Sequence, residues 1–243
     1  MCTVTFIPCG DSIYLTSGRD EQTARPPAEF PRLHVWKGQS LLFPRDSRAG
    51  GSWIAVHPNG NSIVLLNGAK KKHPYLPPYK KSRGLVLLEI ISCQSPQISF
   101  QEMDMDGIEP YTIILIENKR LIKGIWDGKV KNMELLDHKQ PFIWSSVTLY
   151  DRDTIKNREF RFSQWMKENP DPGVGDIIFF HRKAGVGDSR NELRMNRNDN
   201  FRTQSICTMV LTEEAVHFHY LDLLNDEIFN QRMNFQKTKS VFE

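Results

Sequence analysis

The 243-residue sequence lacks the features typical of membrane, secreted or nucleic-acid-binding proteins. No apolar run approaches the roughly 20 residues that cross a bilayer, so we expect no integral membrane segment. The start, from Met1 to Pro8, has neither the basic nor the long apolar region of a signal peptide, which predicts a cytoplasmic protein. The 32 basic and 29 acidic residues nearly cancel to a net charge of +3, which argues against a nucleic-acid partner.

Cysteine is scarce as well. The four cysteines are Cys2, Cys9, Cys93 and Cys207, and no two have Cys-x-x-Cys spacing. This excludes the common zinc sites and a disulfide framework, so we expect reduced thiols. The seven histidines form no His-Glu-x-x-His pattern. His217 and His219 alternate on one face of a predicted strand and could suit a metal, but a surface pair is the more ordinary explanation. We therefore expect neither a metal nor a cofactor.

Hydrophobic patterning predicts hairpins in the first part of the chain. Thr3–Ile7 and Ser12–Thr16 are short runs of strand-forming residues separated by the turn residues Pro8–Asp11. Ser52–His57 and Ser62–Leu66 flank Asn59-Gly60, a strong hairpin signal. A proline-rich loop lies between these two hairpins.

The rest of the chain alternates helices and strands. Ser82 can cap a helix through Ser92, which would place Cys93 in or near the core, and Asp153–Glu168 is a second predicted helix. Gly173–Asn200 is long, polar and rich in Gly and Arg, so we expect it to be partly mobile. Further predicted strands are Tyr111–Ile116, Leu121–Trp126, Val130–Leu136, Ser205–Leu211 and Ala215–Leu221. Mostly antiparallel strands with interspersed helices predict an α+β layered fold, and without a linker we expect one domain over residues 1–243.

Cys2 is the first candidate for chemistry. Small second residues generally permit removal of Met1, and Cys2 would then carry a free α-amino group. The thiol could act as a nucleophile and the amine, with an ordinary pKa of roughly 7.7–8.0, as its base. The alternative is that a small second residue has no catalytic meaning.

Two further elements can lie close to Cys2. The cluster Thr16–Glu21 follows the strand that should pair with the first one, so Arg19 could lower the thiol pKa and Asp20 could orient the α-ammonium. Asn67 lies where an apolar strand ends, and its amide could donate to a developing oxyanion. An exposed charged turn and an ordinary Asn-Gly turn are the alternatives.

The order of these elements resembles the NRDE family, also called transport and Golgi organization 2-like. The resemblance lies in Met1-Cys2, Gly18–Glu21 with Arg25-Pro26, Gly50–Trp53 and Asn67, and it resumes at Ser82–Gly84 and Arg202–Ser205. It implies a four-layer αββα sandwich of mostly antiparallel sheets, similar to N-terminal-nucleophile hydrolases such as penicillin V acylase and bile salt hydrolase.

Carried over residue by residue, the resemblance implies Cys2 as nucleophile, Arg19 and Asp20 as supporting charges, and Asn67 as oxyanion donor. The implied substrate-binding residues are Arg202, Glu21 and Trp53. Two positions depart from the family pattern. Gly18 stands where the motif has asparagine, and Ser145-Ser146 is the best match to a Ser-Asn pair, so a catalytic asparagine is missing there.

Two functions follow from this pattern. The first is an amidohydrolase or acyltransferase acting on a small acyl-amide. The second keeps the fold without turnover and binds a lipid-like ligand in lipid handling or Golgi organisation, since fold alone cannot choose between them. The basic segment Lys70–Arg83 is either a solvated loop or a basic rim that attracts anionic ligands. Oligomeric state has no signal in the sequence.

Overall fold

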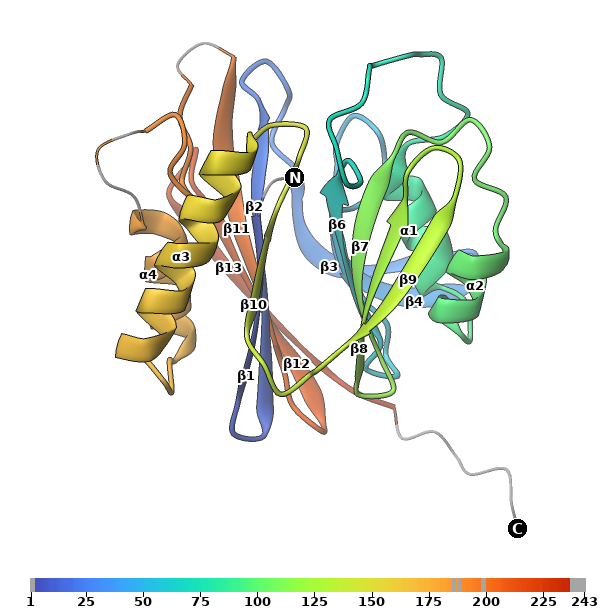
Figure 1. Cartoon of the computed structure of the whole chain (residues 1–243). Helices are drawn as coiled ribbons and strands as arrows, with labels where there is room; N and C mark the ends of the chain where they lie inside the picture. The colour runs from blue at the N-terminus through green and yellow to red at the C-terminus, as the bar shows by residue number, and fades with distance from the viewer. Residues whose placement is uncertain (1–2, 185–186, 188, 198–199, 237–243) are drawn as a thin grey trace.

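The computed structural model describes residues 3–184, 187, 189–197 and 200–236. Two antiparallel sheets stack face to face, and a pair of helices covers the outer face of each (Figure 1). Helices α3 (Arg152–Glu168) and α4 (Val174–Lys183) lie on the first sheet, and α1 (Arg83–Ile91) and α2 (Pro96–Glu102) on the second. The predicted αββα sandwich is confirmed.

The first sheet has the strand order β10-β1-β2-β11-β12-β13. Thr3 lies opposite Gly18 and Cys9 opposite Ser12, so the first two strands are antiparallel neighbours as expected. The long strand β2 also pairs with β11, which joins the N-terminal hairpin to the C-terminal part of the chain. The bounds are β1 Thr3–Cys9, β2 Ser12–Gln22, β10 Phe142–Ser145, β11 Phe201–Leu211, β12 Ala215–Asp222 and β13 Glu227–Asn234.

The second sheet follows chain order, β3-β4-β5-β6-β7-β8-β9. Its strands β5 and β6 form the predicted hairpin, with Gly60 in a left-handed conformation at the turn. The predicted meander of three strands forms β7 to β9. The bounds are β3 Glu29–Trp36, β4 Gln39–Arg45, β5 Ile54–Val56, β6 Ser62–Asn67, β7 Tyr111–Glu117, β8 Arg120–Trp126 and β9 Lys131–Leu136.

Helix α1 begins where the sequence predicts. The Ser82 hydroxyl accepts a hydrogen bond from the Leu85 backbone at 3.4 Å. Its first turn packs directly on the backbone at Gly51, where an added Cβ would lie 2.5 Å from the Gly84 carbonyl carbon. A side chain at position 51 would therefore push the helix away from the second sheet.

The helical layers differ from the sequence analysis at two points, a helix that was not predicted and a cysteine that was misplaced. Gly173–Asn200 contains helix α4, because Ile177 and Phe180 bury one apolar stripe of this polar segment against the first sheet. Cys93 is exposed, not near the core, because α1 ends at Ile91 and the chain turns outward after its cap.

The main core lies between the two sheets. Val4, Phe6 and Leu15 of the first sheet pack there with Trp53, Ile54 and other side chains of the second. Along β1, Thr3 and Thr5 alternate with these residues and face α3 and α4. None of the described helices is long and apolar enough to span a membrane.

Candidate functional site

A cavity of about 750 Å³ lies where residues of the two sheets meet. Its lining comes from β2, the turn after β4, the segment before β5, the end of β6 and the loop that leads to α1. Four residues predicted from the sequence line it: Arg19, Glu21, Trp53 and Asn67. The loop contributes Tyr75, Tyr79 and Lys81, so part of the predicted basic segment forms one wall.

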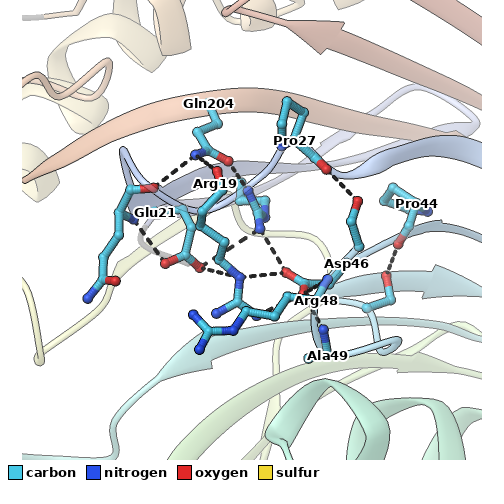
Figure 2. A network of polar contacts seen from close by, with 12 residues as sticks. Arg19, Glu21, Pro27, Pro44, Asp46, Arg48, Ala49 and Gln204 are labelled. Atoms are coloured by element: carbon cyan, nitrogen blue, oxygen red, sulfur yellow. Dashed lines mark hydrogen bonds and ion pairs between the residues drawn. The ribbon is translucent and has the colours of Figure 1, made fainter.

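Asp46, in the turn after β4, is the centre of the polar network beside this cavity (Figure 2). Its carboxylate accepts from Arg19 Nη2 at 2.8 Å and from Arg25 Nη2 at 2.7 Å. The backbone N–H of Ala49 donates to the same group at 2.8 Å and closes the turn. Burial alone would raise the pKa of Asp46, but the hydrogen bonds from Arg25, Ala49 and Arg19 outweigh it and lower the pKa to about 2.

Arg19 is almost completely buried, with only 2% of its side chain exposed. Besides Asp46 it donates to the side-chain oxygen of Gln204, and its guanidinium carbon lies 5.0 Å from the centre of the Trp53 ring. Gln204 in turn donates to the backbone oxygens of Gln22 and Arg25. The guanidinium is thus held between a carboxylate, an amide and an aromatic ring, with its charge largely compensated.

Glu21 and Arg25 form the more exposed edge of the network. Glu21 lies 3.7 Å from Arg25 and 3.9 Å from Arg19, at the long end of ion-pair distance. The Arg48 guanidinium also lines the cavity and has no ion pair within the described part of the chain. The cavity mouth therefore carries an excess of positive charge.

Asn67 ends β6 and is half-buried. Its backbone oxygen accepts from Ser146 Oγ at 2.7 Å, which ties β6 to the segment after β10. Its side-chain amide makes no hydrogen bond to any residue that the structure describes, so it is available to a ligand in the cavity.

Asp20 does not line this cavity. Because β2 runs on to Gln22, Arg19 and Asp20 are consecutive strand residues and point to opposite faces of the sheet. The Asp20 carboxylate is buried on the helical side, where the hydroxyls of Tyr150 and Thr203 donate to it at 2.6 and 2.5 Å.

Arg158 of α3 holds the start of β1 from that same side. Its Nη1 donates to Thr3 Oγ1 at 2.5 Å, and its Nη2 donates to the backbone oxygens of Asn191 and Glu192. The guanidinium also stacks on Tyr150, 3.6 Å from the ring centre. One buried arginine thus links the first described strand residue to the tyrosine that binds Asp20.

The remaining predicted residues lie elsewhere. Cys2 lies outside the described residues. Arg202 is exposed on β11, opposite Glu21, and does not line the cavity. Gly18 pairs with Thr3, and a Cβ there would meet its nearest neighbours at 3.9 Å, so glycine is not required by space. In the described ranges, no three or more His, Cys, Asp or Glu side chains are placed to hold a metal ion.

The sequence did not single out Asp46 or Gln204, although both contact Arg19. Gln204 stands inside the segment Arg202–Ser205 that carries the family resemblance, so a signal was present for it. Asp46 follows Pro44-Arg45 in an ordinary turn pattern, and only the stacking of the second sheet on the first brings it to Arg19.

Comparisons with known proteins agree with this architecture. A family model described as Transport and Golgi organisation 2 matches residues 1–171. No curated protein matches the chain by sequence. Among solved structures, a Caenorhabditis elegans N-acylethanolamine-hydrolyzing acid amidase ortholog is similar, with 12% identity, a TM-score of 0.59, and coverage of 86% of this chain and 92% of that one.

A variant of the conjugated bile acid hydrolase from Clostridium perfringens is similar over 100% of this chain and 99% of its own, with 12% identity and a TM-score of 0.60. These neighbours have the N-terminal-nucleophile hydrolase fold, and at this identity they show the fold alone. The family match covers well over half of the sequence. The chain therefore belongs to the Transport and Golgi organisation 2 family.

Proposed function

We propose that this protein hydrolyses or transfers the acyl group of a small acyl-amide, with Cys2 as nucleophile after removal of Met1. The observation that carries the proposal is the position of β1. Val4 and Phe6 face the inter-sheet core, and Thr3 lies beside Gly18, one residue before Arg19. If the alternation of β1 continues by one residue, Cys2 faces the same side as Arg19 and the cavity.

The proposed reaction uses the terminal residue twice. The α-amine of Cys2 takes the thiol proton, the thiolate attacks the carbonyl carbon, and the C–N bond breaks as the α-ammonium protonates the leaving amine. Water then hydrolyses the thioester and restores the thiol. The unpaired amide of Asn67 donates to the oxyanion, and this interaction accelerates the reaction only if it is stronger in the transition state.

Arg19 and Asp20 support this reaction from opposite faces of β2. Arg19 favours the thiolate, although Asp46 offsets much of its charge and so weakens its effect on the thiol pKa. The α-ammonium is a backbone group at the strand end, so Asp20, held by Tyr150 and Thr203 on the helical side, would orient it from that face. In this proposal Glu21 and Trp53, which line the cavity, contact the substrate. Arg202, which is exposed and does not line the cavity, attracts the substrate only through its charge.

Two general observations support the reaction class and its compartment. The similar structures are, by their names, an amidase and a hydrolase of conjugated bile acids. The described cysteines Cys9, Cys93 and Cys207 are free thiols, which suits the reducing cytoplasm that we propose as the location.

A second candidate function, ligand binding without turnover, is favoured by one observation. The asparagines expected at positions 18 and 145–146 are absent, and the Ser146 hydroxyl is already bonded to the Asn67 backbone and to Thr148. Among the four described site residues predicted from the sequence that line the cavity, only Asn67 would then offer a side-chain amide to stabilise an oxyanion. On this reading the cavity holds a lipid-like ligand in lipid handling or Golgi organisation.

The deciding experiment is a screen of acyl-amides of varied chain length against wild type, Cys2→Ser and Cys2→Ala. Intact mass comes first: if Met1 is retained, Cys2 has no free amine and the mechanism fails. We expect turnover in wild type, at least about a hundredfold loss in Cys2→Ser, and none in Cys2→Ala. Binding that is equal in all three proteins, without turnover in any, would establish the second function instead.

Alkylation at neutral pH supplies an internal control. Exposed Cys93 is an ordinary accessible thiol, so it sets the rate of an unactivated cysteine. We expect iodoacetamide to modify Cys2 faster than Cys93, and Arg19→Ala to slow only the reaction of Cys2. Equal rates, unchanged by the substitution, would mean that Cys2 is not activated.

A further inference from the structure

A second cavity, of about 730 Å³, opens between the loop after β6 and the segment from β10 into α3. It shares no lining residue with the first cavity. Gly68 follows Asn67 of the first cavity and packs against Val147 and Thr148 of the second, where a Cβ on Gly68 would come within 2.7 Å of Val147. The second cavity is therefore a separate site.

The charges on its lining are strongly unbalanced. Five cationic side chains line the cavity, against the single carboxylate of Asp151; they are Lys70, Lys71, Lys72, Arg152 and Arg197. Asp151 is already engaged as the cap of α3, since it accepts from the Thr154 backbone at 2.8 Å. In the part of the chain that the structure describes, none of the five cations forms an ion pair.

These cations come from three separate segments of the chain. The lysines follow β6, Arg152 begins α3, and Arg197 precedes β11. Arg197 is fixed in place, because it donates to the backbone oxygens of Leu149 and Arg190 at 2.8 and 3.1 Å. The N-terminus of the 17-residue helix α3 adds its partial positive charge at the same place. Because cations from three segments meet at one cavity, the arrangement differs from an ordinary run of solvated lysines.

Most of the remaining lining is apolar. Val147, Leu149 and Ile155 are half-buried and face the cavity beside the Tyr150 ring. An anion bound among the cations would thus have apolar surface next to it. The concave shape suits a small molecule better than a nucleic acid or a membrane, and the near-neutral total charge of the chain agrees with this.

We propose that this second cavity binds a small amphiphile that carries a phosphate group and an apolar portion. A phosphate monoester holds close to two negative charges at neutral pH and accepts from arginine in a bidentate manner, which matches several cations around one pocket. The apolar portion covers Val147, Leu149 and Ile155. The site shares no lining residue with the first cavity and does not depend on the chemistry proposed for Cys2.

The test measures binding of decyl phosphate, below its micelle concentration, by calorimetry on the full chain. Inorganic phosphate and decanol serve as the two partial ligands. We expect decyl phosphate to bind at least about tenfold more tightly than inorganic phosphate, since burial of two methylenes is worth about that factor. We also expect decanol to bind more weakly than decyl phosphate, and the affinity for decyl phosphate to fall with added salt.

Charge reversal locates the site. Lys71→Glu with Arg152→Glu should weaken decyl phosphate at least about tenfold. The matched control, Lys139→Glu with Lys167→Glu, changes two exposed lysines that lie before β10 and in the last turn of α3, at the ends of these elements away from the cavity, and should leave binding unchanged. Arg48→Glu, in the first cavity, should also leave it unchanged.

Several outcomes would overturn the proposal. Equal loss in the control pair would mean general charge attraction, and equal binding of decanol would mean that the cations play no part. Decyl phosphate binding no tighter than inorganic phosphate would refute the apolar portion. Binding to phosphatidate vesicles without binding to monomeric decyl phosphate would assign the cations to a membrane surface instead.

Discussion

Replacing Asp46 by asparagine removes the charge at the centre of the polar network with almost no change in shape. The amide oxygen can still accept from the Ala49 backbone, but the amide nitrogen then faces the guanidinium of Arg19 or of Arg25, donor against donor. Arg19, almost completely buried, then keeps Gln204, the Trp53 ring and the long ion pair with Glu21. We therefore expect Asp46→Asn to destabilise the fold strongly.

The size of the effect follows from burial. Breaking a fully buried pair costs about 3–5 kcal/mol, and the Arg25 side of this network is partly exposed, so we expect about 3 kcal/mol. Part of this cost depends on pH. The folded-state pKa of Asp46 is lowered from 3.8 to about 2, so its stabilisation is present above pH 3.8 and disappears as the pH falls through about 2. With solvent screening this part amounts to about 2 kcal/mol.

The assay is urea unfolding of wild type and variant between pH 7 and pH 2.5. The matched control is Asp106→Asn, because the pair of Asp106 with Lys80 is exposed and should contribute little to stability. The difference between wild type and Asp46→Asn should shrink at the acidic end. A loss as small as that of the control, or a difference independent of pH, would refute the assigned role of Asp46.

Two further predictions concern packing and a buried histidine. Gly51→Ala should lower the free energy of unfolding in urea by more than about 2 kcal/mol, because the new Cβ overlaps the backbone at the start of α1. The control Gly175→Ala, whose Cβ would meet nothing within 4 Å, should change it by less than about 1 kcal/mol. Equal effects of the two substitutions would contradict the close approach at Gly51. Burial, and then the charge of Arg158, lower the pKa of His181 from 6.5 to about 3. The free energy of unfolding should therefore fall by about 1.4 kcal/mol per pH unit as the pH drops below 6.5. His181→Gln should remove this slope, and an unchanged slope would contradict the assigned role of His181.

The local signals in the sequence were sufficient for the elements nearest the cavity. The Asn59-Gly60 turn and the Ser82 cap depend on neighbouring residues alone, and both predicted the observed structure. Strand β13 was missed because only its Met233 side chain is buried along an otherwise polar, edge-lying run. Helix α4 was hidden in the same way by the polar residues that surround Ile177 and Phe180.

The site was harder to predict, because its geometry depends on where one strand ends. The sequence analysis predicted a strand Ser12–Thr16 with the charged cluster Thr16–Glu21 at its end, and it placed both Arg19 and Asp20 beside Cys2. In the structure β2 continues to Gln22 by pairing with β11, so the two side chains separate to opposite faces. Pairing between residues almost two hundred positions apart leaves no local signal.

Acylation of Cys2 is the most direct measurement of the proposed function. Wild-type protein is mixed with a decanoyl anilide, quenched in acid within one turnover, digested, and examined by mass spectrometry. We expect an N-terminal peptide that begins at Cys2 and carries the decanoyl mass, and no such adduct in Cys2→Ala. An N-terminal peptide that retains Met1, or decanoyl adducts on exposed Cys93 and none on Cys2, would contradict the assignment of Cys2 as the nucleophile.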